Sequence, residues 1–241
     1  MACVLSPGIS LADSTASHTG LEMTVSVDGT DYTYTYSELA ELSQDVVEPE
    51  GSTTLAILRT GSITIPSTLQ LSWQELKYDP DPYINFVGAF SNLTGSAQDF
   101  SFSISTAVSP LSASLIGGST VITLADGEED GSAEIKNTAG KPGYSASLDG
   151  VPALDLLDPF SAQVTFLGQV AVATDQAGLP GPTIPAGAVN VNIGIEHRFN
   201  LTGRDSATFN STFLVAVPEP GSALLLGFGA LSLALVRRKS L

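Results

Sequence analysis

Apolar and polar residues alternate along much of this chain with a period of two, which is typical of β-strands that bury one face. The longest run covers residues 189–200, where Asn, Gly, Glu and Arg occupy the positions between the apolar ones. Shorter runs of the same kind cover residues 164–172 and 100–104. In the longest run, four aliphatic side chains are expected to be buried, namely Val189, Val191, Ile193 and Ile195.

A β-hairpin is predicted near the start of the chain. Alternating segments at 24–27 and 32–36 flank Asp28-Gly29, a pair that tolerates the positive φ of tight hairpin turns. Further strands are expected at residues 55–58, 63–65, 69–73, 83–90 and 121–124.

Signals for helices are scarce. A short helix is predicted at 38–47, between Ser37 as a possible N-cap and Pro49 as a stop. The stretch 174–188, rich in proline and glycine, is expected to be a long exposed loop. Many short strands separated by turn residues predict an all-β fold, an antiparallel β-sandwich of the Ig-like or jelly-roll-like kind.

We assign the sandwich to residues 20–216 and a C-terminal signal segment to residues 217–241. Residues 1–19 contain no Lys or Arg and no long apolar stretch, so they do not read as a secretory signal peptide. We expect them to be an unstructured lead, the remnant of a truncated signal region.

The balance of charges excludes one class of partner. The chain has 241 residues, with 25 Asp and Glu against 9 Lys and Arg, and its formal net charge is −16. Such a chain repels phosphate backbones, so no nucleic-acid partner is expected. Its single cysteine, Cys3, excludes an internal disulfide and a cysteine-rich zinc site.

No catalytic constellation stands out in the sequence, and we predict that the protein is not an enzyme. The two histidines are His18, in a Ser/Thr-rich lead, and His197, on the apolar face of its strand. We interpret His197 as a packed core histidine rather than a general base. Trp73 and the tyrosines of 32–36 could stack on sugars, but aromatic residues in strands more often serve packing.

The acidic loop, residues 126–131, is the best candidate for a ligand site. Oxygens at Asp126, Glu128 and Asp130, followed by Gly131, match the first half of a calcium-binding loop. Asn137 stands where such a loop carries its bidentate glutamate, and no helices are predicted on either side. The sequence therefore leaves two interpretations, a calcium site without any other cofactor, or a solvated acidic turn between strands.

The C-terminal segment has three consecutive parts. Pro218, Glu219 and Pro220 come first; an uncharged apolar span begins at Ala223 and ends at Val236; and three bases follow at Arg237, Arg238 and Lys239. The span predicts a membrane helix, with the basic end on the cytoplasmic side. The prolines favour an extended backbone just before it, a shape that fits a protease cleft.

This layout resembles the PEP-CTERM sorting signal of Gram-negative and related bacteria. The resemblance implies a precursor in the inner membrane with its C-terminus in the cytoplasm. It also implies recognition by an exosortase, a membrane protease that cuts near the motif, and delivery of the mature body to the cell surface or outside the cell.

The sequence thus favours an exported, non-enzymatic protein of the cell surface or extracellular matrix. Its acidic surface would stay soluble and let divalent ions bridge it to an anionic polysaccharide. Two alternatives stay open at this stage. One is a carbohydrate-binding module of an exopolysaccharide matrix, and the other is a secreted hydrolase with a pair of carboxylates in a cleft.

Overall fold

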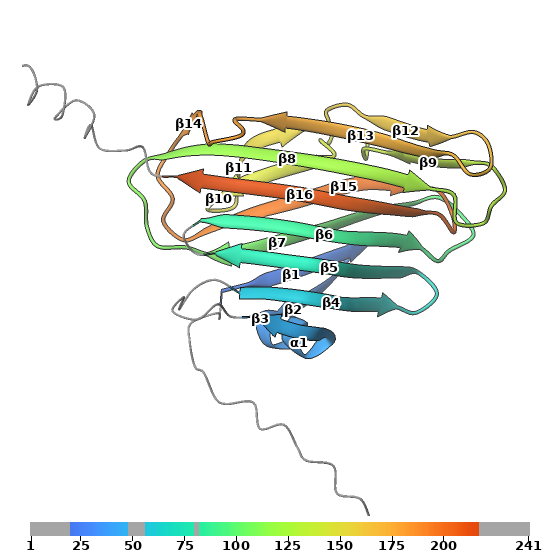
Figure 1. Ribbon diagram of the computed structural model, residues 1–241, viewed down its shortest axis with the longest axis horizontal. Coiled ribbons are helices and arrows are strands. Elements are labelled where there is room, and N and C mark those ends of the chain that lie inside the picture. Colours follow the sequence, from blue (N-terminus) through green and yellow to red (C-terminus); the bar gives the residue numbers. More distant parts are fainter. Residues whose placement is uncertain (1–19, 48–55, 80–81, 217–241) are drawn as a thin grey trace, which may run out of the picture.

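Two antiparallel β-sheets pack face to face in the computed structural model, which describes residues 20–47, 56–79 and 82–216 (Figure 1). The all-β antiparallel sandwich predicted from the sequence is confirmed. The predicted C-terminal helix, the PEP motif and the basic tail lie outside the described residues. Within the described part of the chain, no helix has the length and apolar character needed to cross a membrane.

The first sheet, sheet A, has eight strands. It contains, in spatial order, β11 (Val151–Leu156), β10 (Tyr144–Leu148), β15 (Asn192–Leu201), β7 (Gln98–Ala107), β1 (Glu22–Val27) and β2 (Thr30–Thr35), with β9 (Ala133–Lys136) beside β15 and β12 (Ser161–Val164) beside β9.

The second sheet, sheet B, also has eight strands. It contains, in spatial order, β13 (Val170–Ala177), β8 (Ser114–Ala125), β16 (Ser206–Ala216), β6 (Tyr83–Asn92), β5 (Leu69–Asp79), β4 (Ala56–Ile65) and β3 (Ser43–Val47), with β14 (Ile184–Ala186) also paired to β8.

One hydrophobic core fills the space between the sheets, because alternate residues of the central strands point inward. Its centre is a cluster of aromatic rings from both sheets. The ring of Phe90 in sheet B lies 5.0 Å from those of Phe100 and Phe199 in sheet A, measured between centroids. Val189, Ile193 and Ile195 are buried as predicted.

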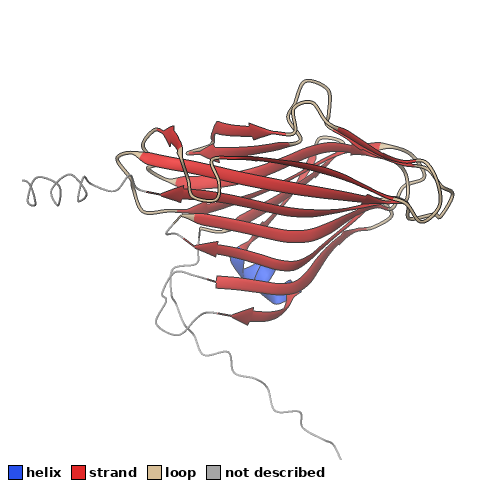
Figure 2. Ribbon diagram, turned by 45° about the horizontal axis from the view of Figure 1, so that its top comes forward, coloured by secondary structure: helices blue, strands red, loops and turns tan. Residues whose placement is uncertain are grey.

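Local sequence explains where the hairpins and the helix form. β1 and β2 pair through the predicted turn, in which Asp28 and Gly29 have φ of 48° and 77°. The one helix of the described residues, α1 (Tyr36–Leu42), lies at an edge of the sandwich (Figure 2). The backbone N–H of Thr35 donates to the Glu38 carboxylate at 2.8 Å, which caps the first turn of α1.

The predicted helix at 38–47 was therefore misplaced. Its first part belongs to α1, which begins at Tyr36 and buries only Leu39, and its second part is strand β3. β3 pairs with β4, so hydrogen bonds to a neighbouring strand replace those that would have continued the helix.

Three further expectations are corrected. The run 164–172 is not one strand, because β12 ends at Val164 and a turn with Gly168 at φ 77° precedes β13. Val191 is 61% exposed, since it lies before β15 begins and its N–H donates to Asp149 Oδ1. The stretch 174–188 has no buried residue, as expected, but it contains the end of β13 and all of β14 rather than one loop.

Candidate functional site

The acidic loop connects β8 to β9, and its carboxylates bind mainly to nearby protein groups. Asp126 Oδ2 accepts a hydrogen bond from the Gly131 N–H at 2.6 Å, and Asp130 Oδ1 accepts one from the Ser132 N–H at 2.8 Å. Glu128 Oε1 lies 2.7 Å from Arg204 Nη1. In the described ranges, no group of three or more His, Cys, Asp or Glu side chains could hold a metal ion.

The neighbouring Asp205 adds a fifth carboxylate to the four of the acidic loop. It accepts hydrogen bonds from the Gly127 N–H at 3.1 Å and from the hydroxyl of Thr202. Burial raises the pKa of the Asp205 carboxyl, and the charges of Asp126 and Asp130 raise it further. Asp126 Oδ1 is buried and accepts no hydrogen bond from the described residues. Calcium binding at this loop stays a prediction.

His197 is completely buried, which confirms that it is a core histidine. Its Nδ1 lies 3.1 Å from the carbonyl oxygen of Gly143 and must donate there, so its Nε2 accepts from Ser211 Oγ at 2.8 Å. Ser211 Oγ lies 2.9 Å from Thr120 Oγ1, and this short polar chain joins the two sheets. Burial lowers the pKa of His197 to about 3, so the ring is neutral at pH 7.

The aromatic residues considered for sugar stacking mostly serve packing. Trp73 is only 2% exposed, and its indole N–H donates to Ser43 Oγ at 3.3 Å. Tyr34 and Tyr36 pack against the core, and of this group Tyr32 alone is exposed, by 37%. A stacking platform at Trp73 is therefore excluded by its position in the core.

A polar surface with two hollows covers part of the outer face of sheet A, and we call it the serine face. Here the outward positions of four adjacent strands carry short hydroxyl side chains around one ion pair. It consists of Thr24 and Ser26 on β1, Ser101, Ser103 and Ser105 on β7, Glu196 and Arg198 on β15, and Ser145 and Ser147 on β10.

Strand pairing sets the serine face in rows. Ser101 pairs with Ser26 on one side and with Arg198 on the other, and Ser103 lies in the same way between Thr24 and Glu196. The inward neighbours of these residues are core residues, so the pleat points Ser101 and Ser103 to the outer side of the sheet. Ser145, also on the outer side, is only 8% exposed, and its hydroxyl donates to Asp155 Oδ1 at 2.7 Å.

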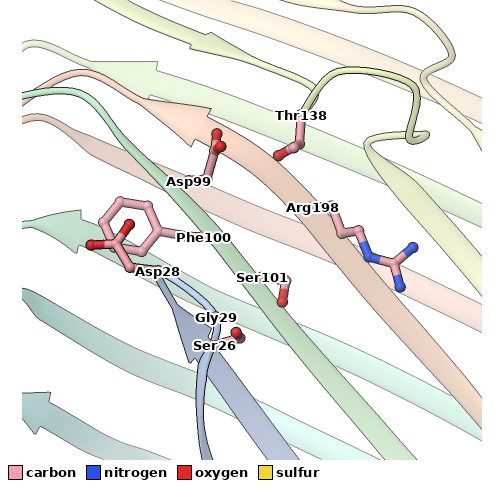
Figure 3. A pocket seen from close by; sticks show the side chains of 8 residues that line it. All are labelled: Ser26, Asp28, Gly29, Asp99, Phe100, Ser101, Thr138 and Arg198. Carbon is pink, nitrogen blue, oxygen red and sulfur yellow. The ribbon is translucent and has the colours of Figure 1, made fainter.

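Short side chains leave two hollows in this face. One, of about 290 Å³, lies between the β1–β2 turn and Arg198 and is lined by Ser26, Asp28, Gly29, Asp99, Phe100, Ser101, Thr138 and Arg198 (Figure 3). The other, of about 340 Å³, lies between β7 and the β10–β11 hairpin and is lined by residues that include Ser103, Ser147, Gly150, Pro152, Glu196 and Arg198. Arg198 belongs to both hollows.

The charges of the serine face are held in place by hydrogen bonds. Arg198 Nη2 lies 2.7 Å from Glu196 Oε2, and both side chains are about one-third exposed, at 35% and 29%. Burial raises the pKa of the Glu196 carboxyl more than the guanidinium of Arg198 lowers it. Asp99 Oδ1 accepts a hydrogen bond from Asn200 Nδ2 at 2.9 Å.

Sequence reasoning did not find this surface. The alternating serines of 101–105 and 145–147 are visible in the sequence, but only strand pairing shows that they lie next to Glu196 and Arg198.

Comparison with known proteins identifies the C-terminal segment. Residues 216–239 match the PEP-CTERM protein-sorting motif, which confirms the resemblance drawn from the sequence. The match shares only Ala216, the last residue of β16, with the sandwich. No curated protein matches the chain.

Among solved structures, the chain is similar to TmCBM61 in complex with β-1,4-galactotriose, at 11% sequence identity and a TM-score of 0.28. The similarity covers 75% of this chain and 93% of the other. At that TM-score the likeness carries no argument about function.

Proposed function

We propose that this protein is an exported, non-enzymatic component of the cell surface or extracellular matrix, and that an exosortase processes it at its C-terminal end. The observation that carries the proposal is the PEP-CTERM motif at residues 216–239, which implies exosortase-targeted export. The motif combines a Pro-Glu-Pro segment, an uncharged span and a basic end, and each part has a separate physical role.

In the proposed precursor, the span that begins at Ala223 and ends at Val236 crosses the inner membrane as a helix. A helix satisfies its own backbone hydrogen bonds in lipid, and the three bases after it resist translocation. The basic end then lies in the cytoplasm and the sandwich lies on the opposite side. Fourteen residues make a helix of about 21 Å, so the basic side chains would extend to reach the headgroups.

The position of the last strand supports release of a folded body. β16 lies inside sheet B, between β8 and β6, and ends at Ala216, two residues before Pro218. Every strand of the described residues ends before Pro218. A cut at or beyond Pro218 would therefore leave the two sheets and their shared core intact.

For the released body we propose a structural or adhesive role, in which divalent ions bridge its acidic surface to anionic polysaccharide. Direct binding of carbohydrate is the second candidate, and the hollowed serine face is the observation that favours it. A hydrolase is less favoured, because glycoside hydrolases use two carboxylates that face each other across a cleft. In the larger hollow, the Glu196 carboxylate is paired with Arg198 instead.

Replacing Pro218, Glu219 and Pro220 together with alanine tests this proposal. In cells that contain an exosortase, the unaltered protein should leave the membrane fraction, whereas the triple variant should stay in it at full length. Helix can then extend through the recognition segment, and its acidic side chain is lost. The control replaces Pro185, an exposed proline of β14, with alanine and should be released normally. Release of the triple variant at the normal rate would contradict the proposal.

A further inference from the structure

We infer that the serine face binds a neutral, hydroxyl-rich polymer, namely an uncharged polysaccharide. This inference rests on the proposed function, because export is what brings the sandwich beside such polymers.

The shape of the serine face suits a chain-like ligand. The two hollows follow one another across β1, β7, β15 and β10 and share Arg198. Three spacings between adjacent strands make this path about 14 Å long, enough for a short run of sugar units. The β1–β2 turn at Asp28-Gly29 lines one end, and the β10–β11 hairpin at Gly150 and Pro152 lines the other.

The chemistry of the lining groups matches sugar hydroxyls. Serine and threonine hydroxyls both donate and accept, as sugar hydroxyls do, and carboxylates accept. The guanidinium of Arg198 has five N–H donors and uses part of them on Glu196, so it can donate to a ligand as well. The ion pair keeps both side chains in fixed positions between the hollows.

A protein partner fits this face poorly. Protein interfaces depend on large apolar or aromatic anchors in dry pockets. None of the exposed large apolar side chains of the described residues lines either hollow. Of the apolar residues that do, Phe100, Ile104 and Ile195 are buried in the core, and only the small ring of Pro152 is exposed.

The local charge selects a neutral polymer over an anionic one. Three carboxylates, Asp28, Asp99 and Glu196, line the hollows. The positive charges near them are fewer, namely the guanidinium of Arg198 and the ammonium of Lys141, which acts on Glu196. An anionic polysaccharide would meet this excess of negative charge in addition to the net charge of −16 of the whole chain. A neutral chain would make the same hydrogen bonds without that repulsion.

The test measures how three neutral polymers, dextran, laminarin and hydroxyethyl cellulose, retard the full-length protein in native gels with a mild detergent. Alginate, an anionic polymer, is the fourth probe, and EDTA removes the divalent ions that could bridge it to the acidic surface. The blocking variant S103Q/S147Q places longer neutral side chains in the larger hollow. The matched control S72Q/T208Q makes the same change in a hollow of about 350 Å³ on the outer face of sheet B.

We expect at least one neutral polymer to retard the protein and alginate to leave it unretarded. The blocking variant should bind that neutral polymer at least tenfold more weakly, whereas the control variant should bind it normally. Binding to none of the neutral polymers, binding to alginate alone, or equal weakening in both variants would overturn the inference. Near-ultraviolet circular dichroism of each variant establishes that it is folded. The assay uses purified unprocessed protein, so its outcome is independent of whether an exosortase cuts the chain.

Discussion

The buried histidine at the centre of the sandwich makes the stability of this protein depend on pH in a calculable way. Burial lowers the pKa of His197 to about 3 in the folded protein, whereas an unfolded histidine titrates near 6.5. Between these two values the unfolded chain binds the proton and the folded chain does not. Through His197, the free energy of unfolding therefore has its full value above about pH 6.5 and decreases as the pH falls toward about 3.

The magnitude follows from the same two values. Each pH unit within the window changes the free energy of unfolding by about 1.4 kcal/mol, because one proton is bound only in the unfolded state. Lowering the pH from 6 to 4 should thus remove about 2.5 kcal/mol through His197 alone. Carboxylates also make the free energy of unfolding depend on pH. The measurement therefore compares the unaltered protein with a variant that has the same carboxylates.

The informative variant is His197→Gln, which cannot titrate but still carries one donor and one acceptor for Gly143 and Ser211. We expect it to be less stable at pH 7, since it loses the ring stacked on Phe102 at 4.8 Å, and to lose less further stability on acidification. The matched control is His18→Gln, at the only other histidine of the chain, which should behave as the unaltered protein.

Urea unfolding at pH 4, 5 and 6, followed by the fluorescence of the single buried Trp73, measures these free energies. The difference in unfolding free energy between the unaltered protein and His197→Gln should shrink by about 2.5 kcal/mol from pH 6 to pH 4. A constant difference across this range, or an NMR titration of His197 with a midpoint near pH 6.5, would refute the reasoning.

Three further predictions concern other parts of the molecule. Replacing Leu225 and Leu233 with Arg should abolish membrane retention in cells without an exosortase, because an arginine costs about 2.5–3.5 kcal/mol at the centre of a membrane helix. Membrane fractionation checks this, and normal retention would argue against a membrane span. Phe90→Ala should lower the free energy of unfolding by about 3–5 kcal/mol in urea titrations, whereas Phe166→Ala, at a side chain 62% exposed, should change it by about 0.5 kcal/mol or less. If calcium binds at the acidic loop, replacing its two aspartates with asparagine should remove any calcium-dependent rise in melting temperature, and an unchanged rise would place the ion elsewhere.

The fold could be predicted from the sequence wherever one face of a strand is buried against the core. The run that contains Ile193 and Ile195 alternates cleanly because its inward residues meet sheet B and its outward residues meet water. The hairpin at Asp28-Gly29 was also predictable, because its turn needs residues that accept positive φ.

Alternation misled where a strand lies at an edge of the sheet. Val170 and Val172 belong to β13, the edge strand of sheet B, and are 58% and 57% exposed, so their apolar pattern does not report burial. The start of the helix is misplaced in the prediction because its cap depends on a hydrogen bond between the Glu38 carboxylate and the Thr35 backbone, whereas the residue types favour Ser37 as the cap.

The serine face could not be predicted in the same way. Its serines come from three strands, β1, β7 and β10, that are far apart in the sequence, and its ion pair joins two residues of one strand. Only the order of the strands brings them to one surface. The sorting motif is different in kind, because its three parts are contiguous and could be found from the sequence alone.

The intact mass of the mature protein tests the central claim most directly. The protein is isolated from cells that contain an exosortase and from otherwise identical cells that lack it, and both samples are measured by mass spectrometry. We predict a chain that ends near Pro218–Pro220 in the first sample and a full-length chain ending at Leu241 in the second. A full-length chain carrying Leu241 in both samples would contradict the account and leave the C-terminal segment as a plain membrane anchor.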